Sequence, residues 1–209
     1  MAHPVLNRRA FAATALAGAA FVAIPGAAFV AIPGAALALD LNSARALIDR
    51  AIGDVNKVIN SGKPEAAMFK DFEAIFARYA DVNAIARSAL GPAARSASPS
   101  QMKNFTRAYQ SYIGRKYGRR FREFIGGTIE VVDAKPLKSY FEVISVARLR
   151  GEAPFDLRWH VSNKSGKDLF FNIIIEGVNM LASEREEVGA MLKKRKGDID
   201  ALIGDLQSA

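Results

Sequence analysis

Residues 155–161 read Phe155-Asp156-Leu157-Arg158-Trp159-His160-Val161. Apolar and polar residues alternate along this stretch, so that one side of an extended chain is apolar and the other is polar. A period of two is typical of a strand in an antiparallel sheet that has one covered face. The stretch therefore predicts such a sheet, with Phe155, Leu157, Trp159 and Val161 on its covered face.

Further strands are predicted on both sides of this one. Strand-like patterns extend over residues 128–133, 139–150 and 168–175. Asn163-Lys164-Ser165-Gly166 is a candidate for a hairpin turn before the last of them. Four successive strands predict a four-stranded antiparallel sheet.

Helical periodicity flanks the sheet in the sequence. Ser98-Pro99-Ser100-Gln101 has the residues of a capping box, with proline in the first helical turn, and begins a long helix that carries an aromatic stripe. Asp198 is expected to cap a last short helix. Apolar residues recur every three or four positions in the other predicted helices, which cover residues 39–60, about 68–79, about 81–90 and about 179–196. Helices before and after an antiparallel sheet indicate an α+β domain.

The first 38 residues have the organisation of an export signal. The paired arginines Arg8 and Arg9 precede an uncharged, alanine-rich run that ends in Ala36-Leu37-Ala38. We interpret this segment as a Tat-type signal peptide that is cleaved after Ala38, followed by a single mature domain of residues 39–209 in the periplasm. The alternative is an uncleaved anchor, since the run is long enough to span a bilayer.

The composition of the mature chain excludes some functions. Without Arg8 and Arg9, 27 of the 29 basic residues remain against 21 acidic ones, a net charge of +6 that favours anionic lipid headgroups or nucleic acid as partners. Export makes nucleic acid the weaker choice, and we predict no nucleic-acid partner. The chain has no cysteine, which excludes disulfides, thiolate metal sites and cysteine nucleophiles. No long apolar run follows Leu39, so we expect a soluble domain.

Candidates for chemistry are few. His160 is the single histidine after residue 38 and shares the polar side of its strand with Asp156. We expect His160 to be solvated, although an acid–base role with Asp156 or Glu142 is conceivable. One histidine without cysteine makes a zinc site improbable. We predict no catalytic residue, no metal site and no cofactor.

The long helix carries two more features. Gly114 and Gly118 lie four residues apart, where we expect close packing of a neighbouring element. Arg115, Lys116, Arg119, Arg120 and Arg122 form a basic cluster, which is either a solvated helix face or a surface attracted to anionic membranes. Thirteen phenylalanines and five tyrosines form either an ordinary core or the wall of a cavity that holds an apolar ligand.

Several short motifs recur in an order typical of one protein family. They are Ala89-Leu90-Gly91, Ser98 to Gln101 with Phe105, Tyr117, the strand entry from Gly126 to Val132, Ile175-Glu176-Gly177-Val178, and Asp200 to Ile203 with Leu206. With these motifs the chain, from about Leu41 to Leu206, resembles the MlaC (toluene-tolerance) family of periplasmic lipid carriers. Ala94 before Arg95, Leu169, Asn172 and Glu184-Arg185 depart from the family pattern, so a hopanoid-associated (HpnM-like) branch is an alternative.

The resemblance implies a cone-shaped fold that holds phospholipid acyl chains between sheet and helices. It also implies partners, namely an inner-membrane ABC transporter complex and an outer-membrane lipoprotein complex. A carrier needs no nucleophile or metal, because its task is to replace the environment of acyl chains, each methylene of which gains about 0.8 kcal/mol from burial. The hypothesis for the lipid-binding residues is Phe105, Tyr109, Tyr112, Val143, Phe155, Leu157, Trp159, Val161, Ile173 and Ile175.

Two other functions remain open from the sequence. One is a small enzyme that acts on an apolar substrate through His160, Asp156 or Glu142. The other is an envelope protein that docks on a membrane complex without holding a ligand.

Overall fold

The computed structural model describes residues 40–120 and 124–209. The chain divides into units of residues 1–36 and 37–209, and every described residue belongs to the second. The predicted signal segment (residues 1–38), with Arg8, Arg9, Ala36 and Ala38, lies outside the described residues. The elements are α1 (Leu41–Ile59), α2 (Glu65–Tyr79), α3 (Val82–Leu90), the short 3-10 helix η1 (Gly91–Arg95), α4 (Pro99–Arg120), β1 (Thr128–Leu137), β2 (Tyr140–Arg148), β3 (Phe155–Ser162), β4 (Leu169–Ile175), β5 (Val178–Asn179), α5 (Met180–Lys194) and α6 (Ile199–Ser208).

The sheet confirms the predicted α+β class. Its strands are antiparallel in the order β1-β2-β3-β4-β5. The four predicted strands form it, and the two-residue β5 is an addition that the sequence did not indicate. β1 continues to Leu137, beyond the predicted end at Asp133, through an irregularity between Val131 and Asp133. The hairpin turn between β3 and β4 is closed by a hydrogen bond from the Gly166 amide to the Asn163 carbonyl.

Side chains cap the first turns of α4, α5 and α6. At the start of α4, the Gln101 amide donates to Ser98 Oγ and the Ser98 amide donates to Gln101 Oε1, both at 3.1 Å. This reciprocal pair is the capping box that the sequence predicts. Asp198 caps α6 through the Ala201 amide, as expected. Asn179 caps α5 in the same way.

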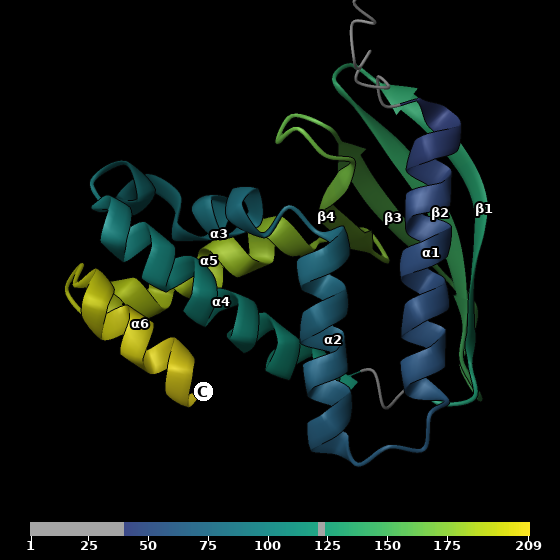
Figure 1. Cartoon of the computed structure of the whole chain (residues 1–209), viewed down its shortest axis with the longest axis horizontal. Coiled ribbons are helices and arrows are strands. Elements are labelled where there is room, and N and C mark those ends of the chain that lie inside the picture. The colour runs from purple at the N-terminus through teal and green to yellow at the C-terminus, as the bar shows by residue number, and fades with distance from the viewer. Residues whose placement is uncertain (1–39, 121–123) are drawn as a thin grey trace, which may run out of the picture. The chain divides into compact units, whose positions relative to one another are not determined.

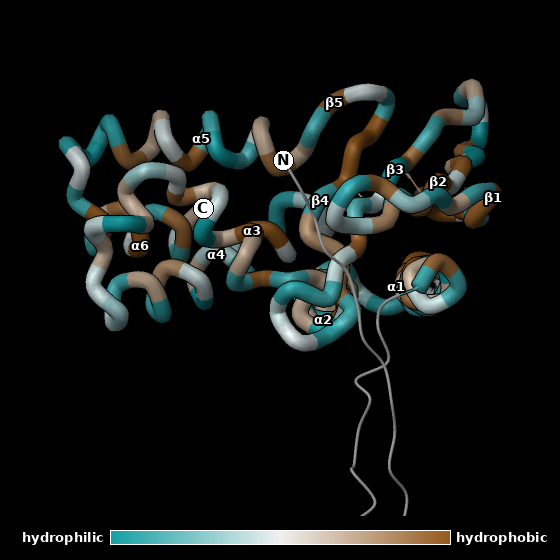
Figure 2. Tube along the Cα trace, turned by 90° about the horizontal axis from the view of Figure 1, so that it is seen from above, coloured by the Kyte–Doolittle hydropathy of each residue, from teal (hydrophilic) through white to brown (hydrophobic). Residues whose placement is uncertain are grey.

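Helix α1 covers one face of the sheet. It packs mainly against β1 and also contacts β2 and β3 (Figure 1). Figure 2 shows the same helix in the view from above, where α5 follows β5 away from the sheet. The buried side chains of α1 are those that its periodicity predicts, namely Ala44, Leu47, Ile48, Ala51, Ile52, Val55 and Ile59. Helical spacing alone therefore determined which side of α1 enters the core.

Close packing of α4 on α2 explains the paired glycines. A methyl group added at Gly114 would lie 3.0 Å from Glu73 Cβ, and one at Gly118 would lie 2.6 Å from the Phe69 ring. Both distances are below normal carbon–carbon contacts, so only glycine lets the two helices approach this closely. The prediction of close packing at Gly114 and Gly118 is confirmed.

Part of the basic cluster on α4 stabilises the fold. Arg115 donates to the carbonyl oxygens of Leu206 at 2.6 Å and of Ala209 at 2.9 Å, where α6 ends. Lys116 pairs with two carboxylates of α5. Arg119 is exposed, whereas the side chain of Arg120 and all of Arg122 lie outside the described residues. In the two described ranges, no helix is both long enough and apolar enough to cross a membrane.

Candidate functional site

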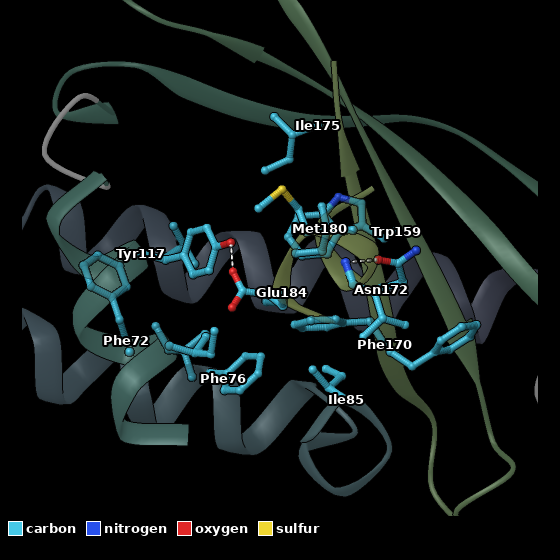
Figure 3. Close-up of a pocket in the computed structure, with 18 of the residues that line it drawn as sticks. Phe72, Phe76, Ile85, Tyr117, Trp159, Phe170, Asn172, Ile175, Met180 and Glu184 are labelled. Carbon is cyan, nitrogen blue, oxygen red and sulfur yellow. Dashed lines mark hydrogen bonds between the residues drawn. The ribbon is translucent and has the colours of Figure 1, made fainter. Parts of the chain in front are cut away.

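An apolar cavity of about 170 Å³ lies between the sheet and the helices. Its volume is similar to that of engineered apolar cavities of about 150 Å³, which stay dry and bind benzene. Strands β3 and β4 provide one wall, and helices α1, α2, α3, α4 and α5 provide the rest. The lining consists of Ala51, Val55, Phe72, Ile75, Phe76, Ile85, Tyr109, Ile113, Gly114, Tyr117, Gly118, Trp159, Phe170, Phe171, Asn172, Ile173, Ile175, Met180, Leu181 and Glu184. Figure 3 shows 18 of these residues around the space and labels ten of them.

Four of the ten predicted lipid-binding residues line the cavity. They are Tyr109, Trp159, Ile173 and Ile175. The other six are not in the lining: Phe105, Tyr112, Val143, Leu157 and Val161 are buried in the core, and Phe155 is half-buried beside Phe124. Phe105 is one helical turn before Tyr109 and stacks on its ring, with the ring centroids 5.7 Å apart. The structure therefore places Phe105 behind the cavity wall, as support for Tyr109.

Trp159 is held in one orientation within this wall. Its Nε1 donates a hydrogen bond of 2.9 Å to Ser145 Oγ on the neighbouring strand. The edge of the Phe170 ring meets its indole at a centroid distance of 5.3 Å and an angle of 77°. A buried indole N–H needs a partner, and Ser145 provides it without exposing the cavity to a polar group.

The cavity lining includes residues of α2 and α5 that the sequence did not predict. Phe72, Ile75 and Phe76 belong to the apolar stripe of α2, but periodicity does not distinguish a residue that faces a cavity from one that fills the core. Met180 and Leu181, at the start of α5, are brought to the cavity by the turn after β4. The Leu181 amide donates to Asn172 Oδ1 at 3.1 Å, which fixes this end of α5 on the sheet.

A polar cluster joins α5 to α4 at the edge of the cavity. Glu184 Oε1 accepts hydrogen bonds from Tyr117 Oη at 2.5 Å and from Lys116 Nζ at 2.7 Å. Glu187 accepts from Lys116 and from Tyr112. Burial disfavours the charged form of Lys116, but its hydrogen bonds to Glu184 and Glu187 outweigh this effect and raise its pKa. Burial, followed by the hydrogen bond to Glu187, raises the pKa of Tyr112 to about 12.

The polar side of β3 is less solvated than predicted. His160 is only 8% exposed, because the rings of Tyr140 and Phe171 pack beside it, with centroid distances of 4.7 and 5.8 Å. The expectation of a solvated histidine is therefore wrong. Glu142 is also buried and lies 3.7 Å from His160 Nε2 and 3.1 Å from Lys135 Nζ. His160 and Glu142 are not part of the cavity lining. Among the described residues, no cluster of three or more histidines or carboxylates is arranged to hold a metal ion.

Comparisons with known proteins support one assignment. The sequence model described as "MlaC protein" matches residues 49–208. The intermembrane phospholipid transport system binding protein MlaC of Haemophilus influenzae is 24% identical over 136 residues, which span 63% of this chain and 63% of that protein. A solved structure of a phospholipid-binding protein from Ralstonia solanacearum, in complex with a phospholipid, superimposes with a TM-score of 0.68 at 20% identity over 79% of this chain and 95% of that chain. Since the family match covers most of the chain, this protein belongs to the MlaC family.

Proposed function

We propose that this protein is a periplasmic lipid carrier that holds phospholipid acyl chains in the cavity between β3–β4 and the helices. The observation that carries the proposal is the apolar cavity itself, whose wall is built from aliphatic and aromatic side chains. The relative from Haemophilus influenzae is named for phospholipid transport, and the solved structure from Ralstonia solanacearum contains a phospholipid. The descriptions of these two similar proteins support the proposal that the cavity binds a lipid.

The energetics of transfer explain why such a cavity is needed. Each methylene group that leaves a membrane for water loses about 0.8 kcal/mol. A carrier lowers this cost by offering apolar surface in place of water. A volume of about 170 Å³ is small for two acyl chains, so we infer that loading moves α2 away from the sheet. Hydrogen bonds hold the start of α5, whereas apolar contacts hold the α2 side of the cavity.

The proposal includes a route for the lipid. After export through a Tat-type signal and removal of residues 1–38, the soluble carrier moves between an outer-membrane lipoprotein complex and an inner-membrane ABC transporter complex. A net charge of +6 on residues 39–209 favours its approach to anionic headgroups. A hopanoid-like lipid is the alternative ligand, since an apolar wall accepts fused rings as well as chains.

Native mass spectrometry tests this function. The protein is purified without detergent from the compartment to which it is exported, and its mass is compared before and after denaturation. We expect a mass increment in the native spectrum that matches a phospholipid and is lost on denaturation. A native mass equal to that of the chain alone, even after incubation with phospholipid vesicles, would contradict the proposal and favour a docking protein without a ligand.

The function proposed here requires no catalysis. His160, Glu142 and Asp156, the candidates for acid–base chemistry, do not line the cavity. We therefore expect His160→Ala to load as much lipid as the wild type. Loss of a lipid-modifying activity in this variant, with normal loading, would identify an enzyme instead.

A further inference from the structure

Two polar atoms in the wall of the apolar cavity have no hydrogen-bond partner among the described residues. They are the hydroxyl oxygen of Tyr109 on α4 and Oε2 of Glu184 on α5. Tyr109 is fully buried and Glu184 is 3% exposed, so bulk water does not reach either side chain freely. A buried polar group without a partner destabilises the folded protein, so two of them in one cavity require an explanation.

The other oxygen of the Glu184 carboxylate, Oε1, has hydrogen-bond partners. Its Oε1 accepts from Tyr117 and from Lys116, and Figure 3 shows the bond from Tyr117 and the carboxylate at the cavity. The Lys116 ammonium, 2.7 Å away, also compensates the negative charge. The partner that Glu184 Oε2 lacks is therefore a neutral hydrogen-bond donor and not a second cation.

Tyr109 belongs to the same electrostatic environment. Its pKa is raised, first by burial and then by the negative charge of Glu184, so its hydroxyl remains protonated. A protonated phenol is a donor as well as an acceptor. A group that satisfies both residues must donate to Glu184 and can accept from Tyr109.

We propose that the cavity selects a lipid that carries a hydroxyl group within its apolar part, with this hydroxyl donating to Glu184 Oε2 and accepting from Tyr109 Oη. The inference deepens the proposed function and rests on it. A hydroxyl is the smallest neutral group that donates and accepts at once. A saturated chain offers neither role, and the ester carbonyl of a phospholipid only accepts, so neither satisfies Glu184.

A buried water molecule is the competing occupant. Buried waters typically make about three hydrogen bonds. The lining offers only Tyr109 Oη and Glu184 Oε2 as unpartnered polar atoms among the described residues, because Asn172 Oδ1 already binds the Leu181 amide. A hydroxyl attached to a lipid needs only these two partners, since its third position is its own carbon atom.

The test compares matched phospholipids. Delipidated full-length protein is titrated with a phosphatidylglycerol that has a saturated chain, and with analogues whose chain carries one hydroxyl near the ester, at the middle or near the methyl end. Binding is measured by native mass spectrometry. We expect at least one hydroxylated analogue to bind the wild type about tenfold or more tightly than the unsubstituted lipid, as a hydrogen bond to a charged group allows.

Tyr109→Phe removes one of the two partners and keeps the ring. We expect it to lose most of the preference for the hydroxylated analogue, measured as the ratio of its affinities for the hydroxylated and the unsubstituted lipid. Tyr79→Phe is the matched control, because the Tyr79 hydroxyl binds Asp54 at 2.8 Å and does not line the cavity. It should keep the preference.

The outcomes separate this inference from the proposed function. Equal binding of all analogues to the wild type would mean that the two atoms hold bound water only, and would overturn the inference while leaving the carrier intact. An unchanged preference in Tyr109→Phe would also overturn it. Failure of the wild type to bind any of the lipids would contradict the proposed function itself.

Discussion

Trp159 Nε1 donates a hydrogen bond of 2.9 Å to Ser145 Oγ inside the core. The two residues lie on adjacent strands, and Trp159 is opposite Val143 in the register of β2 and β3. Ser145 is fully buried, so the bond is protected from water. The pair sets the plane of the indole in the cavity wall, and Trp159 is the single tryptophan of the chain. Its fluorescence therefore reports on the cavity.

Replacing Ser145 by alanine should destabilise the protein, because the Trp159 indole loses the hydrogen bond that orients it. The indole N–H would lose its buried partner, at a cost of about 1–3 kcal/mol in the free energy of unfolding. Urea unfolding followed by Trp159 fluorescence measures this loss. Ser96→Ala is the control, because its exposed hydroxyl binds only a backbone carbonyl, and we expect a change within about 0.5 kcal/mol. Equal unfolding free energies of the two variants would show that the hydrogen bond between Trp159 and Ser145 does not contribute to stability.

Replacing Gly114 by alanine should push α4 away from α2. The new methyl group would meet Glu73 Cβ at 3.0 Å, and this atom cannot move without the α2 backbone. We expect a net loss of about 1–2 kcal/mol in unfolding free energy, despite the better helix propensity of alanine. Gly53→Ala in α1 meets no atom within 4 Å and should be stabilising by up to about 1 kcal/mol. A stabilised Gly114→Ala would show that α2 and α4 do not pack this closely.

Filling the cavity should reduce lipid occupancy. Ile173 lines the cavity, whereas its neighbour Ile174 is absent from the lining and pairs with Arg158 and Asn179. Ile173→Trp should displace about two methylene groups of a bound chain, which corresponds to roughly tenfold weaker binding. Ile174→Trp adds the same volume outside the cavity and should bind normally. Native mass spectrometry of lipid-loaded protein compares the two, and equal loading would remove Ile173 from the binding site.

The protein should lose stability as the pH falls through about 6.5. Burial lowers the pKa of His160 from its usual 6.5, and nearby Glu142 opposes this shift. The unfolded chain then binds a proton at His160 that the folded protein resists, so unfolding becomes easier below about pH 6.5. One proton accounts for at most about 1.4 kcal/mol per pH unit.

His160→Gln tests this dependence, because it removes the titration and keeps a polar side chain beside Glu142 and Asn172. The neighbouring charged groups Lys135 and Arg158 remain in both proteins. The free energy of unfolding, measured in urea between about pH 8 and pH 5, should fall less steeply for the variant. Carboxylates with lowered pKa values, such as those of Asp54 and Glu187, titrate below this window. Identical slopes would exclude His160 as the cause.

The local sequence pattern predicts most of the helices and strands. Every buried residue of α1 was predicted from its spacing, and the Ser98–Gln101 capping box fixed the start of α4. Both depend on neighbours within one or two turns, so the chain itself contains the information. The sequence predicted the four long strands, and the structure shows that they neighbour one another in chain order. The two-residue β5 has too few positions to show a period.

The sequence by itself thus determined an α+β domain and the apolar sides of α1 and β3. Only the tertiary structure decided which apolar side chains enclose the cavity: Trp159 and Ile173 line it, while Leu157 and Val161 on the same strand face fill the core. It also decided that His160, on the polar side of β3, is covered by Tyr140 and Phe171. The reason is that periodicity reports the polarity of a side, whereas a cavity or a covered surface depends on side chains that distant elements bring opposite it.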